Sequence, residues 1–104
     1  MRGDVFAVRA PRDARDHEQK GRRYAVVVQS DALPISTMLV APTSASARPT
    51  DFRPEVQVAG KTTRVLVEQT VAISPDRLGD YICHLSFNEL RDVDEALAIV
   101  LGID

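Results

Sequence analysis

The 104-residue sequence has few of the features that mark exported, membrane or metal-binding proteins. Its one cysteine, Cys83, cannot form an internal disulfide, which predicts an unreactive buried thiol in a reducing cytoplasm. The longest apolar run, residues 96–101, is too short to cross a bilayer, and an acid at position 4 argues against a signal peptide. Its two histidines, a structural His84 and a surface His17, form no metal-ligand cluster of recognisable spacing. We therefore expect a cytoplasmic protein without membrane association, metal or cofactor.

Glycine-rich phosphate loops, nucleophile elbows, internal repeats and linkers are also absent from the sequence. With 44% hydrophobic and 27% charged residues, the composition is that of a globular chain. Two separate cores would leave each half too small to bury enough surface. We expect a single domain over residues 1–104.

The formal net charge of −2 conceals an uneven distribution of charge. Residues 1–23 carry seven Lys or Arg side chains against four carboxylates, whereas residues 76–104 carry two against seven. A local basic patch sets the field around it whatever the net charge, so the N-terminal part could bind a polyanion. The alternative is an ordinary solvated surface of mixed charge.

Short apolar or β-branched runs separated by turn residues predict strands over most of the chain. The continuous run at 23–29 is typical of a strand covered on both faces. Ala59-Gly60-Lys61 predicts a hairpin turn, since Gly60 allows a positive φ. The expected strands are 4–9, 23–29, 37–41 (closed by Pro42), 55–58, 62–67, 70–73 and 81–85, with long loops at 10–22 and 43–53.

Helix signals are confined to the C-terminal third. Ser74 and Pro75 predict an N-cap and first turn of a short helix to Gly79. Ser86 and Glu89 form a capping box before an apolar stripe (Leu90, Val93, Leu97 and Val100 or Leu101) that ends at Gly102. Many short strands with a terminal helix favour a mainly β (α+β) fold, a small curled antiparallel barrel.

Four short sequence motifs, present in this order, resemble those of a known family. Together they extend from residue 2 to the terminal helix. They are Arg2-Gly3-Asp4-Val5, the run 18–29 (EQKGRRYAVVVQ), Thr43 after the third strand, and Leu66-Val67-Glu68-Gln69 followed by 74–78 (SPDRL). This succession resembles the MazF/PemK/Kid family of toxin–antitoxin ribonucleases.

The resemblance implies an SH3-like barrel with short helices that forms a homodimer. It implies sequence-specific, metal-independent cleavage of single-stranded RNA and inhibition by a cognate MazE-like antitoxin. The family's catalytic Arg and Thr fall on Arg23 and Thr43, and its motif residues on Glu18, Gln19 and Gln69.

Elementary chemistry is compatible with those two catalytic assignments. RNA cleavage without metal uses the ribose 2′-hydroxyl as nucleophile and needs stabilisation of a phosphorane. Arg23 offers a planar fork of donors that matches phosphate oxygens, and Thr43 offers a compact hydroxyl. The general base stays open between a loop side chain such as His17, a backbone group and water. Taken alone, Arg23 could instead pair with Glu68, and Thr43 could cap the turn after Pro42.

RNA contacts are expected from the two loops and the strand ends beside them. Tyr24 could stack on an unpaired base or be buried within its strand. The full set of expected RNA-binding residues is Arg12, Arg15, His17, Glu18, Gln19, Lys20, Tyr24, Ser44, Arg48, Arg53 and Gln69.

Two other functions fit a small barrel with a basic edge. One is a non-catalytic toxin of the CcdB kind that binds DNA gyrase, and the other is a non-toxic RNA-binding module. Neither needs an Arg23–Thr43 pair beside a basic groove.

Overall fold

A computed structural model describes residues 1–9 and 23–103, so the predicted loop at 10–22 lies outside the described residues. The described part contains strands, two short 3-10 helices and an α-helix. Their bounds are β1 (Asp4–Val8), β2 (Tyr24–Val27), β3 (Met38–Ser44), β4 (Glu55–Val58), β5 (Lys61–Val65), η2 (Val67–Gln69), β6 (Val71–Ile73), η3 (Pro75–Arg77), β7 (Leu78–His84) and α1 (Phe87–Leu101).

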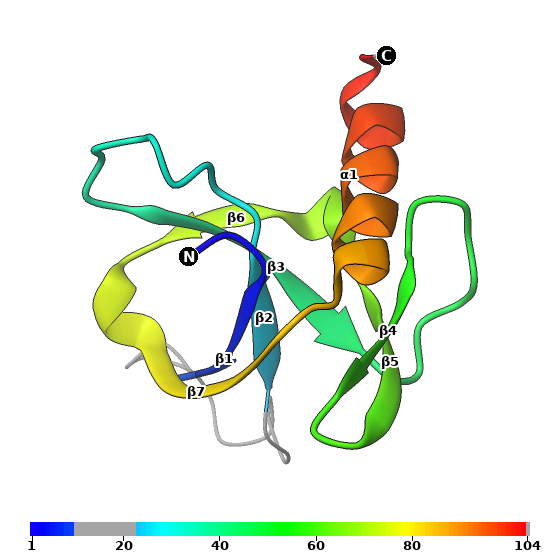
Figure 1. Ribbon diagram of the computed structural model, residues 1–104, viewed down its shortest axis with the longest axis horizontal. Coiled ribbons are helices and arrows are strands. Elements are labelled where there is room, and N and C mark those ends of the chain that lie inside the picture. The colour runs from blue at the N-terminus through cyan, green and yellow to red at the C-terminus, as the bar shows by residue number, and fades with distance from the viewer. Residues whose placement is uncertain (10–22, 104) are drawn as a thin grey trace.

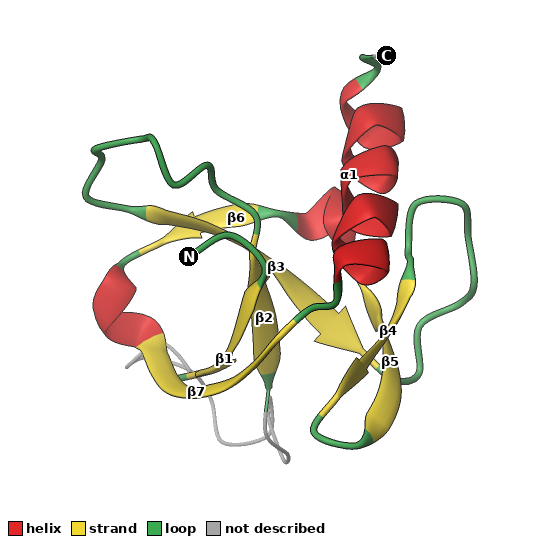
Figure 2. Ribbon diagram, in the orientation of Figure 1, coloured by secondary structure: helices red, strands yellow, loops and turns green. Residues whose placement is uncertain are grey.

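The strands form one curled antiparallel sheet in the order β4-β5-β3-β2-β1-β7, and β6 pairs with β3 off this path (Figure 1). Helix α1 follows the last strand and stands beside the sheet, next to the β4–β5 hairpin (Figure 2). The predicted mainly β fold, a curled antiparallel sheet with a C-terminal helix, is confirmed.

Apolar side chains fill both faces of β2, as its continuous β-branched run predicts. Val26 and Val28 belong to the larger core cluster, which also contains Val93 and Ala96 of α1. Ala25 and Val27 point the other way into a smaller cluster with Val40 and Ile73. Because the sheet curls, β2 is enclosed on both sides, which fixes the position of its N-terminal end at Tyr24.

Helix α1 begins and ends at the predicted residues. Ser86 accepts a hydrogen bond from the Glu89 backbone, Glu89 reaches back to the Ser86 backbone, and Gly102 closes the helix in the left-handed conformation. The predicted apolar stripe is wrong in its last turn, because Val100 and Leu101 are exposed where the helix extends beyond the sheet (Figure 1). Within the described residues, no helix is long and apolar enough to cross a membrane.

Pro42 does not end the third strand, contrary to the prediction. Strand β3 continues through Pro42 to Ser44, with Pro42 opposite Ala25 of β2. The Pro42 carbonyl faces away from β2 and accepts a hydrogen bond from the Leu66 amide at 2.8 Å. On that side, β3 pairs with β6 before Pro42 and with β5 after it. The missing N–H of Pro42 therefore falls where β3 pairs with neither of these two strands.

Two other predicted boundaries are also wrong. The helix expected over 74–79 is only the 3-10 turn η3, and Ser74 makes no side-chain cap, because the chain enters β7 at Leu78 and pairs there with Val8. The strand expected over 62–67 ends at Val65, since Val67–Gln69 forms η2. In the first case long-range pairing decides the boundary, and local residue patterns do not contain that pairing.

Gly3 fits tightly between two distant segments at the start of β1. Its amide donates to the Val27 carbonyl at 2.8 Å, and its carbonyl accepts from the Leu85 amide at 2.9 Å. Its φ of +92° is unfavourable for residues with a side chain. A Cβ here would lie 2.8 Å from Cε1 of His84, whose Nδ1 is held by Asp4 Oδ1 at 2.9 Å. The His84 side chain is exposed but hydrogen-bonded to Asp4, and its predicted structural role stays a prediction.

Replacing Gly3 with alanine should lower the free energy of unfolding by about 1–3 kcal/mol, from backbone strain plus displacement of the His84 ring. Gly60→Ala is the matched control, because Gly60 has φ +77° but nothing within 4 Å of an added Cβ. Urea unfolding of both variants should show the larger loss for Gly3→Ala. Equal losses would contradict the proposed contact with His84.

Candidate functional site

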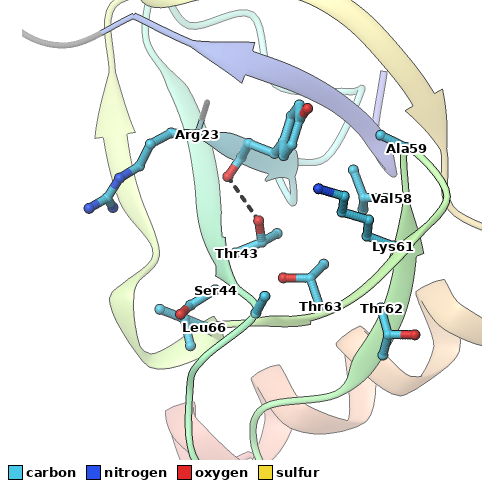
Figure 3. Close-up of a pocket in the computed structure, with 11 residues that line it drawn as sticks. Arg23, Thr43, Ser44, Val58, Ala59, Lys61, Thr62, Thr63 and Leu66 are labelled. Carbon is cyan, nitrogen blue, oxygen red and sulfur yellow. Dashed lines mark hydrogen bonds between the residues drawn. The ribbon is translucent and has the colours of Figure 1, made fainter. Parts of the chain in front are cut away.

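A cavity of about 750 Å³ lies between the adjoining ends of β2 and β3 and the β4–β5 hairpin (Figure 3). Hydroxyl side chains and two cations dominate its polar lining. The lining residues are Arg23, Tyr24, Thr43, Ser44, Ala45, Val58, Ala59, Lys61, Thr62, Thr63 and Leu66. No carboxylate is among these lining residues, so the described walls favour an anionic ligand.

Thr43 is held in this cavity by the strands on both sides of it. It pairs with Val65 of β5, and its Oγ1 donates to the Tyr24 carbonyl of β2 at 3.4 Å. That bond is long, so a better acceptor could replace it at small cost. Thr43 therefore does not cap a turn, as the alternative interpretation had it, but presents its hydroxyl inside the cavity (Figure 3).

Arg23 immediately precedes β2 and also lines the cavity. Its carbonyl accepts from the Val8 amide at 2.9 Å, which anchors its backbone to β1. Its guanidinium points away from Thr43 (Figure 3). The β2–β3 register, with Ala25 opposite Pro42, accounts for this, because alternation puts Tyr24 and Thr43 on one face and Arg23 on the other. The structure thus brings Arg23 and Thr43 to one cavity without bringing their side chains together.

Tyr24 and Ser44, two of the expected RNA-binding residues, line the same cavity. Tyr24 is half-buried and packs against the larger core cluster. Burial within the strand is therefore partly confirmed, and stacking on an unpaired base stays a prediction.

Arg48, Arg53 and Gln69 do not line the cavity. Arg53 donates through Nε and Nη2 to Oε2 of Glu68 at 3.0 and 2.7 Å, which ties the loop before β4 to η2. The alternative pairing of Arg23 with Glu68 is wrong, since Glu68 pairs with Arg53 through Oε2, and its Oε1 is buried without a partner among the described residues. Arg48, whose carbonyl accepts from Arg53 at 3.4 Å, and Gln69 are exposed.

The remaining expected contacts fall outside the described residues. These are Arg12, Arg15, His17, Glu18, Gln19 and Lys20. Their roles stay predictions.

Lys61 and Thr63 of β5 line the cavity, and the sequence alone did not indicate them. In the sequence, Lys61 indicates only a hairpin turn, and Thr63 indicates only a strand. A usable signal was present, because alternation along β5 places residues 61 and 63 on the same face. What the sequence lacked was the position of that face relative to Thr43.

Within residues 1–9 and 23–103, no group of three or more His, Cys, Asp or Glu side chains is arranged to hold a metal ion. Cys83 is half-buried, and burial raises the pKa of its thiol, as expected for an unreactive cysteine.

Comparison with known proteins assigns the family. Residues 1–101 match the model described as "PemK-like, MazF-like toxin of type II toxin-antitoxin system". The chain belongs to this toxin family. A Mycobacterium tuberculosis protein named as a candidate toxin is 42% identical over 104 residues, covering 99% of this chain and 98% of its own.

Solved structures of the family share the fold at low sequence identity. A mycobacterial endoribonuclease in complex with its cognate antitoxin has a TM-score of 0.81 and 18% identity, covering 100% of this chain and 96% of its own. The M. tuberculosis toxin MazF-mt6 has a TM-score of 0.78 and 15% identity, with coverage of 97% and 98%. A MazE–MazF structure from Deinococcus radiodurans has a TM-score of 0.75 and 18% identity, with coverage of 99% and 95%. These relatives give no support to the gyrase-binding alternative.

The Arg53–Glu68 pair should make stability depend on pH. Hydrogen bonds from Arg53 lower the pKa of Glu68 against the opposing effect of burial. The carboxylate then stabilises the fold above its unfolded pKa of about 4.3, and this contribution is lost as pH falls through the lower folded value. Glu68→Gln should cost about 1 kcal/mol at pH 7 and progressively less below pH ~4.

Urea unfolding of the wild type and Glu68→Gln between pH 3 and 7 measures this difference. Glu55→Gln is the control, because its contact with Arg64 is 3.5 Å long and exposed. A Glu68→Gln protein with the same pH profile as the wild type would disprove the stabilising pair.

Proposed function

We propose that this chain is an endoribonuclease toxin that cleaves single-stranded RNA at specific short sequences, without metal, and is inhibited by a cognate antitoxin. The observation that carries this proposal is the cavity that Arg23 and Thr43 share, whose described lining is rich in hydroxyls and cations and lacks carboxylates. Membership of the toxin family and the endoribonuclease named among the structural neighbours support it.

The proposed reaction is an internal transesterification of the RNA. The 2′-oxygen loses its proton and bonds to the adjacent phosphorus, and the bond to the 5′-oxygen breaks. The departing 5′-oxygen takes up a proton, so the products are a 2′,3′-cyclic phosphate and a 5′-hydroxyl. The enzyme must orient the attack and stabilise the charge that develops on the phosphorane oxygens.

We assign Thr43 to hydrogen-bond one of those phosphorane oxygens. Its hydroxyl lies in the cavity, and among the described residues it meets the Tyr24 carbonyl alone, at 3.4 Å, an interaction that a charged oxygen would outcompete. Thr43 is held on two sides by paired strands, so the hydroxyl is positioned before RNA arrives.

We assign Arg23 to bind the phosphate from the cavity edge and to stabilise the phosphorane or protonate the leaving oxygen. The role requires its exposed side chain to turn toward the cavity, and rotamer changes of exposed side chains take picoseconds to nanoseconds. Its pKa, above ~12, makes a guanidinium a poor general base, so the base is another group: a loop side chain such as His17, a backbone group or water.

We further propose a homodimer and a MazE-like antitoxin as partners. MazE–MazF complexes among the structural neighbours support the antitoxin assignment. An acidic antitoxin segment would compete with RNA for the cationic cavity, which suits inhibition by direct occlusion. We place this activity in the cytoplasm, where single-stranded RNA is available and a lone cysteine stays reduced.

Incubating the purified protein with a long unstructured RNA in EDTA tests the proposed activity. We expect discrete cuts with 5′-hydroxyl ends at recurring short sequences. Intact RNA together with inhibited gyrase supercoiling would refute the nuclease and favour the gyrase-binding alternative.

Thr43→Val and Arg23→Ala should each lower the cleavage rate at least ~10²-fold, the typical cost of losing one charge-stabilising group. Valine keeps the shape and the β-branch of threonine, so the fold should persist by circular dichroism. Thr37→Val, at an exposed position outside the cavity, is the control and should cleave normally. Wild-type rates for a folded Thr43→Val or Arg23→Ala protein would remove that residue from the mechanism.

A further inference from the structure

The cavity wall opposite Thr43 carries a cation at a fixed place, Lys61. Val58 pairs with Lys61 across a two-residue turn in which Ala59 and Gly60 have φ of +54° and +77°. Positive φ at both central positions is the signature of the tight type I′ hairpin turn, whose twist matches that of the strands. Lys61 therefore starts from a well-defined backbone position at the cavity rim.

The Lys61 side chain extends into the cavity, on the side where the Thr43 and Thr63 hydroxyls lie (Figure 3). Lys61 and Thr63 share one face of β5, and Thr63 is buried with 8% exposure. The ammonium of Lys61 and two hydroxyls thus face the same space.

The described carboxylates nearest in the chain are engaged elsewhere. Arg64 contacts Glu55, and Arg53 holds Glu68. Within residues 1–9 and 23–103, Lys61 forms no ion pair. An ammonium directed into a hydroxyl-lined cavity without a carboxylate partner is placed to receive an external anion.

Strand alternation gives this lysine a role that Arg23 does not fill. Arg23 lies on the opposite face of the β2–β3 pair from Thr43, and its guanidinium points outward. Of the two cations that line the cavity, Lys61 is the one directed to the side of the Thr43 hydroxyl.

We propose that Lys61 binds a phosphate of the RNA backbone inside the cavity and positions the strand against Thr43. This inference rests on the proposed ribonuclease function. A compact ammonium on a flexible stem acts as a point charge, so it should bind phosphate without reading base sequence.

The test compares the wild type with Lys61→Gln, Lys61→Arg and Arg91→Gln. The last removes one positive charge from an exposed site on α1, outside the cavity. Binding is measured over a range of KCl concentrations with a fully 2′-O-methylated single-stranded RNA pool, which 2′-hydroxyl attack cannot cleave. Cleavage rates and cut positions are measured on the unmodified pool.

For Lys61→Gln we expect about tenfold weaker binding at low salt and a salt slope smaller by about 0.7, the loss of one phosphate contact. Cleavage should slow about equally at every site, with the cut positions unchanged. Lys61→Arg keeps the charge and should stay within ~3-fold of the wild type, and Arg91→Gln should match the wild type.

If Lys61→Gln kept the affinity and the salt slope of the wild type, the proposed phosphate contact would be overturned. If Lys61→Gln altered the cut positions, Lys61 would contact bases and not phosphate. The proposed function fails separately. A wild type that leaves RNA intact, with the salt slope still reduced in Lys61→Gln, would refute the nuclease and retain the phosphate contact.

Discussion

Strand β3 is the element on which the rest of this structure depends. Along one side it pairs with β2, and along the other it exchanges β6 for β5 at Pro42. A residue without an N–H can stand at that exchange without leaving a donor unpaired. Past it, the β4–β5 hairpin stands across from the ends of β2 and β3. The cavity with Thr43 on one wall and Lys61 on the other is a consequence of this change of partner.

Much of the fold follows from local chemistry, which explains why it could be predicted from the sequence. The apolar run of β2 is buried on both faces, the Ser86–Glu89 capping box starts α1, and Gly60 forms the hairpin turn. Two of the errors share one cause, which is long-range pairing. Pro42 predicts a strand end although β3 continues through it, because a local pattern does not show which side of the strand lacks a partner. Gly79 lies in β7 and not in the predicted helix, because Leu78 pairs with Val8, which is distant in the sequence.

The residues of the site also divide into those that local sequence motifs predict and those that depend on long-range structure. Four of the cavity residues could be predicted because they lie in or beside recognisable family motifs. They are Thr43, Arg23, Tyr24 and Ser44, and all four line the cavity. Arg53 could not be judged, because its engagement with Glu68 depends on how the loop before β4 folds back on η2. Lys61 became visible only with the hairpin in place. The orientation of Arg23 depends on strand alternation and on the β2–β3 register, which the sequence motifs do not specify.

Among the described residues, the β4–β5 hairpin joins the sheet through two residue pairs, Thr43 with Val65 and Ser44 with Arg64. Val56, Val58 and Val65 anchor its base in the core. Its tip, residues 59–62, is exposed. Insertions or exchanges at the tip would therefore leave the registers of β1, β2 and β3 intact. This wall of the cavity can therefore change in length or charge while the hydroxyl on the opposite strand stays in place, so the affinity of the cavity for an anion can vary independently of the geometry around Thr43.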